Sequence, residues 1–247
     1  SEDAKEAAIV EVNSETDFVA KNDTFRTYVA EVADQALTTA ATDIEGFLAE
    51  DSKAEAGKTV KEALDGKIAV IGENLNIRRF AKVSAADGFV ASYIHAGGKI
   101  GVLVEVATDV VNDEIKEMAK NIAMQITAMK PVYTNDSEVD EEYKAHELEI
   151  IKSQIENDPK MAGKPEKVIN GAIMGRLNKQ LKEICLLDQV YVKAEDGKQS
   201  VAAYVAQVAK ANGANVTVKG FVRFETGEGM EKKNEDFAAE VAAQLGK

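Results

Sequence analysis

The sequence predicts an α+β protein with two related β-α subdomains built on small antiparallel sheets, a protruding antiparallel helical coiled-coil hairpin and a C-terminal helical module. Three observations lead to this fold class. A pattern of alternating apolar strand, short polar turn and amphipathic helix recurs along the chain. Two further strand-like runs lie between its first two copies, and a long polar helical segment follows the second copy. Such segregated strands and helices are typical of α+β domains.

The first copy starts with the alternating run at residues 8–12 and passes through residues 16–19 into a helix. Spacings of three and four place the apolar side chains of this helix on one stripe, which suits packing on a sheet. We expect Asn22 or Asp23 to cap the helix. The stripe consists of Phe25, Tyr28, Val29, Val32 and Leu37.

Two strand-like runs at residues 80–85 and 89–95 are separated by the turn Ala86-Asp87-Gly88. A second turn at residues 96–99 leads into the alternating run at residues 101–106. Short turns that contain glycine are typical of hairpins when apolar runs flank them. We therefore expect the three runs to form an antiparallel meander.

The second copy continues from that run through residues 108–111 into another helix, and a third copy starts with the run at residues 220–225 and ends in an apolar helix at residues 237–245. The first two copies match element by element, so a duplicated β-α unit is predicted. The second helix carries its apolar stripe on Ile115, Met118, Ala119, Ile122, Ile126 and Met129.

Residues 137–185 form a polar segment with a helical pattern that is broken once, between Pro159 and Pro165. The narrow apolar seams of the two arms suit a two-helix coiled coil. The first arm is mainly acidic and the second mainly basic, so antiparallel pairing sets opposite charges against each other. Pro165 fits the first turn of the returning helix. The seams are Val139, Tyr143, Leu148, Ile151 and Ile155, then Val168, Ile169, Ala172, Ile173, Leu177, Leu181 and Ile184.

These elements divide the chain into five consecutive segments. We expect a core N-subdomain over residues 1–87, a core C-subdomain over 88–136 and 187–227, the hairpin over 137–186, and the C-terminal module over 228–247.

The composition is that of an ordinary globular protein, with 45% hydrophobic and 30% charged residues. The formal net charge of −13 repels phosphate backbones and anionic lipids, so we expect neither direct nucleic-acid binding nor membrane binding. The single Cys185 excludes an internal disulfide and fits a reducing cytoplasm. A protein partner is therefore the best expectation.

The sequence contains no recognisable catalytic or metal-binding set. Its two histidines, His95 and His146, belong to different predicted elements, and converging metal ligands are missing. The run Gly97-Gly98-Lys99 lacks the first glycine and the following Ser or Thr of a phosphate-binding loop. A small-molecule enzyme with His95 as general base is a weaker hypothesis, because a second catalytic group is absent. We expect a non-enzymatic protein without a cofactor.

Phe18 is the one residue that the fold alone does not explain. It lies beside Asp17 in the polar connection between strand and helix. In one interpretation it is a hydrophobic staple that packs back on Phe25 or Val29. In the other it is an exposed aromatic anchor for a partner's pocket, a residue type typical of interface hot spots. The residues alone favour the staple.

Residues 12–21, VNSETDFVAK, closely resemble the signature of the elongation factor Ts family. Residues 71–79, IGENLNIRR, resemble the second signature of this family, and residues 92–95 with 101–104 resemble its central hairpin. The run from FVRFETGEG at residues 221–229 through DFAAEV at 236–241 resembles its C-terminal block. The blocks occur in the same order and span essentially the whole chain.

This resemblance implies a guanine-nucleotide exchange factor that binds the GTPase elongation factor Tu and promotes GDP release by disturbing its magnesium and phosphate site. Asp17 and Phe18 match the pair that contacts the GTPase domain, where the aromatic ring inserts between helices. Ile71 and Gly72 match a second contact at the same place. His95 matches a residue of the neighbouring hairpin, and Thr16 and Val19 complete the first motif.

The resemblance further implies a cytoplasmic factor of bacterial type, with an organellar origin left open. Family members usually begin with a small helical domain that also grips the GTPase, and this sequence starts after it, so weakened exchange is a possible consequence. The alternative is a structural adaptor that self-associates through the helical hairpin.

Overall fold

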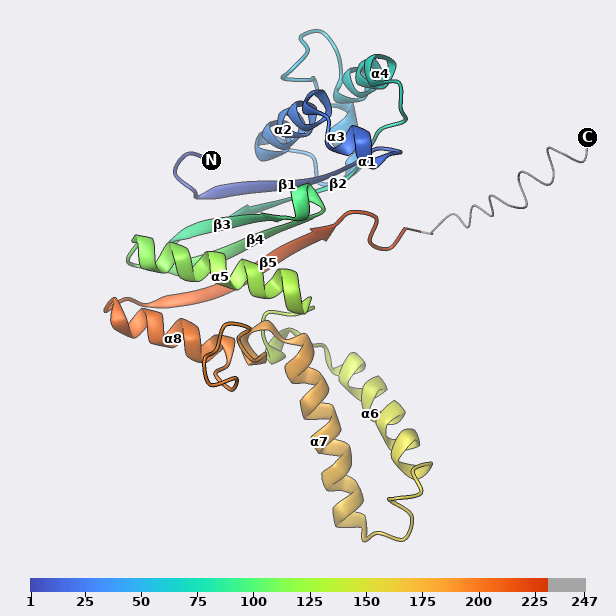
Figure 1. The fold of residues 1–247 in the computed structure, drawn as a ribbon, viewed down its shortest axis with the longest axis vertical. Helices are drawn as coiled ribbons and strands as arrows, with labels where there is room; N and C mark the ends of the chain where they lie inside the picture. Colours follow the sequence, from blue (N-terminus) through green and yellow to red (C-terminus); the bar gives the residue numbers. More distant parts are fainter. Residues whose placement is uncertain (231–247) are drawn as a thin grey trace, which may run out of the picture.

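The computed structural model describes residues 1–230. It has an α+β fold with two antiparallel sheets, one of two strands and one of three. The two sheets lie between helices, and a helical hairpin projects from the end opposite α4 (Figure 1). The predicted helix at residues 237–245, and with it most of the predicted C-terminal module, lies outside the described residues. Within them, none of the helices is long and apolar enough to cross a membrane.

The N-terminal unit pairs β1 (Glu6–Asn13) with β2 (Asn76–Ser84) in antiparallel register. Four helices follow β1 and lie on one side of this pair: α1 (Asp17–Ala20), α2 (Asp23–Thr38), α3 (Ile44–Ala49) and α4 (Val60–Ile71). The predicted apolar stripe of α2 is confirmed up to Val32, because Phe25, Tyr28 and Val32 are buried in one core with residues of β1 and β2, while Leu37 is not part of this core. Asn22 caps α2, as expected, by accepting the N–H of Thr24.

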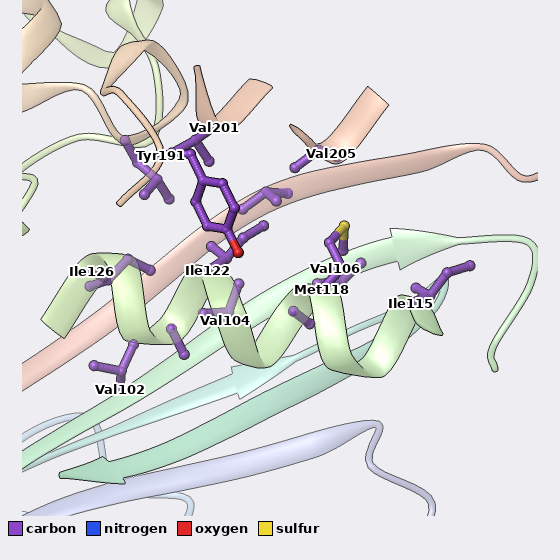
Figure 2. Close-up of a cluster of buried hydrophobic side chains, with 14 of the residues drawn as sticks. Val102, Val104, Val106, Ile115, Met118, Ile122, Ile126, Tyr191, Val201 and Val205 are labelled. Carbon is purple, nitrogen blue, oxygen red and sulfur yellow. The ribbon is translucent and has the colours of Figure 1, made fainter. Parts of the chain in front are cut away.

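The second unit is the sheet β3 (Phe89–His95), β4 (Ile100–Thr108) and β5 (Val216–Glu225), with β4 in the centre. The short helix η1 (Ala96–Gly98) joins β3 to β4. Helices α5 (Asp113–Met129) and α8 (Val201–Ala211) cover the outer face of the sheet. Figure 2 shows the resulting core, in which side chains of α5 point at those of β4 and the Tyr191 ring closes one side. The predicted stripe of the second helix is thus confirmed up to Ile126, while Met129 is exposed.

The predicted meander is wrong at its first turn, since β2 pairs with β1 and only β3 continues into β4. Backbone bonds show how the chain changes sheet: Ala85 N–H donates to the Lys5 carbonyl and Val90 N–H to the Ala4 carbonyl. A Cβ on Gly88, where φ is +108°, would lie 2.0 Å from a β4 carbonyl oxygen, so this crossing needs glycine. The long pairing of β1 with β2 satisfies the backbone of β2 without β3.

The two sheets pack on each other through a small apolar cluster between them. Ile9 of β1 meets Val90 and Leu103 of the three-stranded sheet, and all three are buried. Along β1, alternate residues face the helices and this second cluster, as expected from the two-residue period of a strand. The inter-sheet face of β1 therefore contains Ile9 and, two residues later, Glu11.

The predicted helical hairpin is present as α6 (Glu141–Glu156) and α7 (Glu166–Ile184). It has its own apolar core of Ile151, Ile155, Ile173 and Leu177. Val168 and Ile169 were both predicted in the seam, but only Ile169 packs against this core, and Val168 is 49% exposed. Within the described residues one ion pair joins the arms, Arg176 to Asp158 at 3.4 Å, so most of the opposite charges face solvent.

Two short helices flank the hairpin, η2 (Asp136–Glu138) before it and η3 (Leu186–Asp188) after it. Pro165 is the N-cap of α7, one position earlier than predicted. Cys185 is fully buried at the base of the hairpin, as expected for a small core residue. The five segment boundaries given above remain predictions.

Candidate functional site

Phe18 is displayed to solvent by the short helix α1. Its side chain is 82% exposed, whereas the adjacent Val19 is partly buried against the core beneath α2. The staple interpretation is therefore wrong, because Val19 supplies the apolar contact that Phe18 was expected to make. The corresponding residue of the second copy, Val110, packs against its core, so of these two copies the first exposes this position and the second does not.

A single carboxylate fixes the start of this loop. Glu73 Oε2 accepts the backbone N–H groups of Glu15 at 3.1 Å and Thr16 at 3.0 Å, and Glu73 Oε1 accepts the Thr16 hydroxyl. Thr16 in turn caps α1 by accepting the Val19 N–H at 3.3 Å. We call these contacts the Glu73 clamp. The clamp holds the segment that presents Phe18 with charge-assisted hydrogen bonds.

The end of α4 supplies the clamp. Ile71 is the last helical residue and packs partly against the N-terminal core, while the neighbouring Val70 is 76% exposed. Gly72 ends the helix with φ of 82°, a left-handed conformation that glycine adopts at least cost. The chain turns there, and the next residue is Glu73. The predicted contacts Ile71 and Gly72 are thus joined to the Phe18 loop through the clamp.

Glu73 was not among the predicted site residues. Its local signal was present, since an acid directly after a helix-ending glycine is placed to accept backbone N–H groups of a neighbouring loop. The sequence could not say which loop, because residues 15–16 and residue 73 are far apart along the chain.

Asp17 is the first residue of α1, and His95 is the last residue of β3. Asp17 bonds to Lys21 at 2.8 Å, and this bond, together with the charges of Lys21 and Lys99, lowers the pKa of Asp17. Lys99 follows η1, so the end of the β3–β4 hairpin lies within electrostatic reach of the Phe18 loop. His95 ends β3 as an exposed residue, with Nδ1 3.1 Å from the Tyr93 hydroxyl.

The exposed Phe18 loop offers a binding surface within the described residues. No group of three or more His, Cys, Asp or Glu residues there is placed to hold a metal ion. The other histidine, His146, is exposed on α6, as expected for a surface residue. Burial raises the pKa of the Cys185 thiol to about 11, and Asp188, Asp136 and Glu138 add to this shift, so the thiol stays protonated.

An α+β fold that displays an aromatic ring on a clamped loop has the features of a protein that binds another protein. The family model described as elongation factor TS matches residues 15–228. The chain belongs to the elongation factor Ts family.

Curated relatives named elongation factor Ts agree with this family along the whole chain. The protein from Clostridioides difficile (strain 630) is 49% identical over 245 residues, which is 99% of this chain and 78% of the relative. The protein from Clostridium botulinum (strain Alaska E43 / Type E3) is 48% identical over 247 residues, 100% of this chain and 79% of the relative. One from Clostridium perfringens (strain 13 / Type A) is 44% identical over 247 residues.

Proposed function

We propose that this chain is a guanine-nucleotide exchange factor that binds elongation factor Tu and promotes GDP release during translation elongation. The observation that carries the proposal is the 82% exposure of Phe18 in the loop that matches the family signature. Aromatic side chains are enriched among the residues that contribute most to binding at protein interfaces, so an exposed Phe in this loop suits contact with a partner. Family membership supports the GTPase elongation factor Tu as that partner.

Exchange requires the factor to bind one state of the GTPase better than another. A factor that binds the nucleotide-free or distorted state more tightly weakens GDP binding by the same factor, because the coupling is reciprocal. In the proposal Phe18 acts as a wedge between helices beside the magnesium and phosphate site. Burying its ring contributes about 1.5–3 kcal/mol, which is available only if those helices move apart.

The Glu73 clamp lowers the conformational entropy cost of placing Phe18 in an interface. Ordering a flexible interface side chain costs about 0.5–1.5 kcal/mol, and a loop that is already fixed loses less on binding. Thr16 and Val19 fix the two ends of α1, so that Asp17 and Phe18 between them are presented in one orientation. The proposed contacts are therefore preorganised in the free protein.

The remaining proposed contacts surround the wedge. In the proposal Ile71 and Gly72, which precede the clamp residue Glu73, form a second contact with the GTPase, and His95 contacts the same domain from the β3–β4 hairpin. No covalent step is part of this function, so the chain is not an enzyme in the usual sense and needs no cofactor. A role in translation elongation is consistent with a cytoplasmic location.

The test is release of a fluorescent GDP analogue from purified elongation factor Tu. The full chain should accelerate release, and Phe18→Ala and Ile71→Ala should lose most of the acceleration. Met174→Ala is the matched control, because Met174 is an exposed apolar residue on α7, far from the site (Figure 1). Thermal stability of Phe18→Ala should match the parent, since an exposed ring contributes little to folding. Normal exchange by Phe18→Ala would contradict the wedge.

One observation favours the alternative of a self-associating adaptor. The hairpin exposes Ile150, Val168 and Met174 at 38%, 49% and 49%, which offers apolar surface to a second copy. This role could accompany exchange, because the hairpin and the Phe18 loop lie at opposite ends of the molecule (Figure 1). Sedimentation of the chain with and without its hairpin distinguishes the two roles.

A further inference from the structure

Glu11 is a buried acid that the proposed contacts do not use. It is 3% exposed and bonds to two guanidinium groups: both carboxylate oxygens accept Arg78 Nη1, at 3.0 and 3.1 Å, and Oε2 accepts Arg79 Nε at 2.6 Å. Oε1 also accepts the Gly227 N–H at 2.9 Å and the Asn13 amide at 3.1 Å. One carboxylate thus connects β1, β2 and the turn after β5.

That turn, residues 225–228, is held by further main-chain bonds. Arg79 Nη2 donates to the Glu225 carbonyl at 3.2 Å, and Arg78 Nη2 donates to the Glu228 carbonyl at 2.6 Å. From the other side, Thr226 N–H donates to the Lys99 carbonyl at 2.9 Å. The 225–228 turn therefore joins the N-terminal unit to the end of η1. We call Glu11, Arg78, Arg79 and this turn the Glu11 hub.

The hub lies between the two parts of the proposed site, the Phe18 loop and the β3–β4 hairpin that ends in His95. Along β1, Glu11 lies on the same face as Ile9, between the two sheets, and Phe18 follows seven residues later. On the other side, Lys99 lies four residues after His95. The apolar cluster around Ile9 holds the middle of the sheets together, and the hub holds their edge next to the site.

The chemistry of the hub favours one fixed geometry. Burial alone would raise the pKa of Glu11, but the Gly227 N–H, Asn13, Arg78 and Arg79 lower it below its usual value, so the carboxylate is charged. Guanidinium–carboxylate bonds are directional, and Arg79 also stacks on Phe224 with 4.2 Å between guanidinium and ring centroid. The apolar cluster around Ile9 is non-directional, whereas the guanidinium–carboxylate bonds of the hub specify one geometry at the edge of the sheets.

We propose that Glu11 is a positioning residue for nucleotide exchange: through the hub it fixes the spacing between the Phe18 loop and the His95 hairpin, so that both contact the GTPase together. This inference rests on the function proposed above. Glu11 itself touches no partner, because it is buried.

The first test examines the hub in the free chain. Amide hydrogen exchange at Thr226 and Gly227, followed by NMR, should be faster in Glu11→Gln than in the parent. Glu50→Gln is the matched control, since Glu50 also accepts several donors, among them Thr39 at 2.6 Å and the Ala40 N–H at 3.1 Å, but lies away from the turn. Unchanged protection of both amides in Glu11→Gln would overturn the hub.

The second test is a double-mutant cycle on the rate of GDP release from elongation factor Tu. In the parent, His95→Ala should slow release by about tenfold, the scale of a well-placed interface side chain. In Glu11→Gln, the same change should cost less than about twofold, because His95 is no longer held in place. A merely destabilised protein would show the same fold-change for His95→Ala in both backgrounds, and that result would overturn the positioning role.

Arg78→Gln provides the same test if Glu11→Gln folds poorly, because it leaves Glu11 paired with Arg79 while it removes the bond to Glu228. The result also separates this inference from the function on which it rests. If the parent chain fails to accelerate GDP release, the exchange function is wrong. If the parent is active and the effect of His95→Ala is the same in every background, only the positioning role is wrong.

Discussion

At the residue scale, Glu73 controls how firmly Phe18 is presented. The two carboxylate oxygens of Glu73 accept hydrogen bonds from three donors of residues 15 and 16. A glutamine has only one side-chain oxygen, and its NH2 group takes the place of the other. We expect Glu73→Gln to slow GDP release several-fold although Glu73 need not touch the GTPase. Folding stability should fall by less than about 1 kcal/mol, because water replaces the lost partners of these exposed groups.

Amide exchange at Glu15 and Thr16 measures the clamp directly and should accelerate in Glu73→Gln. Glu62→Gln is the control, because Glu62 accepts the Thr59 N–H in the capping box at the opposite end of α4. If Glu62→Gln slows release as much as Glu73→Gln, the effect comes from α4 as a whole and the clamp is not responsible.

Glu225 makes a second residue-scale prediction, on acid titration. Its bond to Lys130 at 2.8 Å and its pairing with Arg223 lower its pKa from 4.5 to about 2. Because the folded pKa is the lower one, the stabilisation is complete above pH 4.5 and is lost as the pH falls from 4.5 toward 2. The NMR chemical shift of the Glu225 carboxyl carbon should titrate with a pKa near the lower value, and Lys130→Met should raise this pKa. A normal titration in the parent would contradict the pairing.

Phe18 and Val19 show what residue patterns can and cannot predict. The sequence correctly placed an apolar anchor and an exposed polar loop before α2, but two neighbouring apolar residues compete for one core position. The choice between them depends on the direction in which α1 leaves β1, which the distant Glu73 fixes. Only the family resemblance indicated that Phe18 is the exposed one.

At the element scale, the two strand–helix copies and the hairpin of α6 and α7 were predicted, whereas α3, α4 and α8 were not, and the pairing of β2 was predicted wrongly. The two strand–helix copies follow from local periodicity, and β1, α2, β4 and α5 all lie where it places them. The pairing of β2 with β1 instead of β3 depends on contacts between residues about seventy positions apart, for which no local signal exists. A short turn with glycine at residues 86–88 is equally suited to a hairpin and to a crossing between sheets.

The hairpin gives an element-scale prediction from its separate core. Leu177 is 7% exposed between α6 and α7, whereas Val168 on the same helix is 49% exposed. Leu177→Ala should destabilise the hairpin by about 2–5 kcal/mol, the usual cost of emptying a buried leucine site. Val168→Ala should change its stability by less than about 0.5 kcal/mol.

Hydrogen exchange measured by mass spectrometry separates the local effect from a global one. Leu177→Ala should increase exchange in α6 and α7 and leave that of β4 and α5 unchanged, because these elements belong to a different core. Equal acceleration in both regions would mean that the hairpin and the core unfold as one unit.

At the scale of the whole molecule, the site depends on contacts that no single segment contains. The clamp joins residues 15–16 to residue 73, and the hub joins residue 11 to residues 78–79 and 225–228. Charge and composition predicted a protein partner, and the resemblance predicted which loop meets it. The burial of Glu11 could not be predicted from the sequence, because an acidic residue in a strand of alternating pattern is expected to face solvent.

Removal of the hairpin tests whether α6 and α7 contribute to nucleotide exchange. Its two ends are already paired at the base, where Val132 N–H donates to the Ile184 carbonyl at 2.8 Å and Leu186 N–H to the Tyr133 carbonyl at 2.9 Å. Replacing residues 141–183 with a short Gly-Ser linker should therefore leave the rest of the fold intact. We expect the shortened chain to accelerate GDP release as the parent does, because α1 lies far from α6 and α7 (Figure 1) and none of the bonds of the Glu73 clamp or the Glu11 hub involves residues 141–183.

Sedimentation of both chains completes this experiment. If the parent forms dimers and the shortened chain is a monomer with normal exchange, the hairpin is a self-association element that is separate from the exchange site. If the shortened chain is folded but no longer accelerates GDP release, the hairpin takes part in binding the GTPase. The surface around Phe18 then provides only part of the interface. Circular dichroism at the assay temperature provides the folding control, with the loss of helix signal limited to that of α6 and α7.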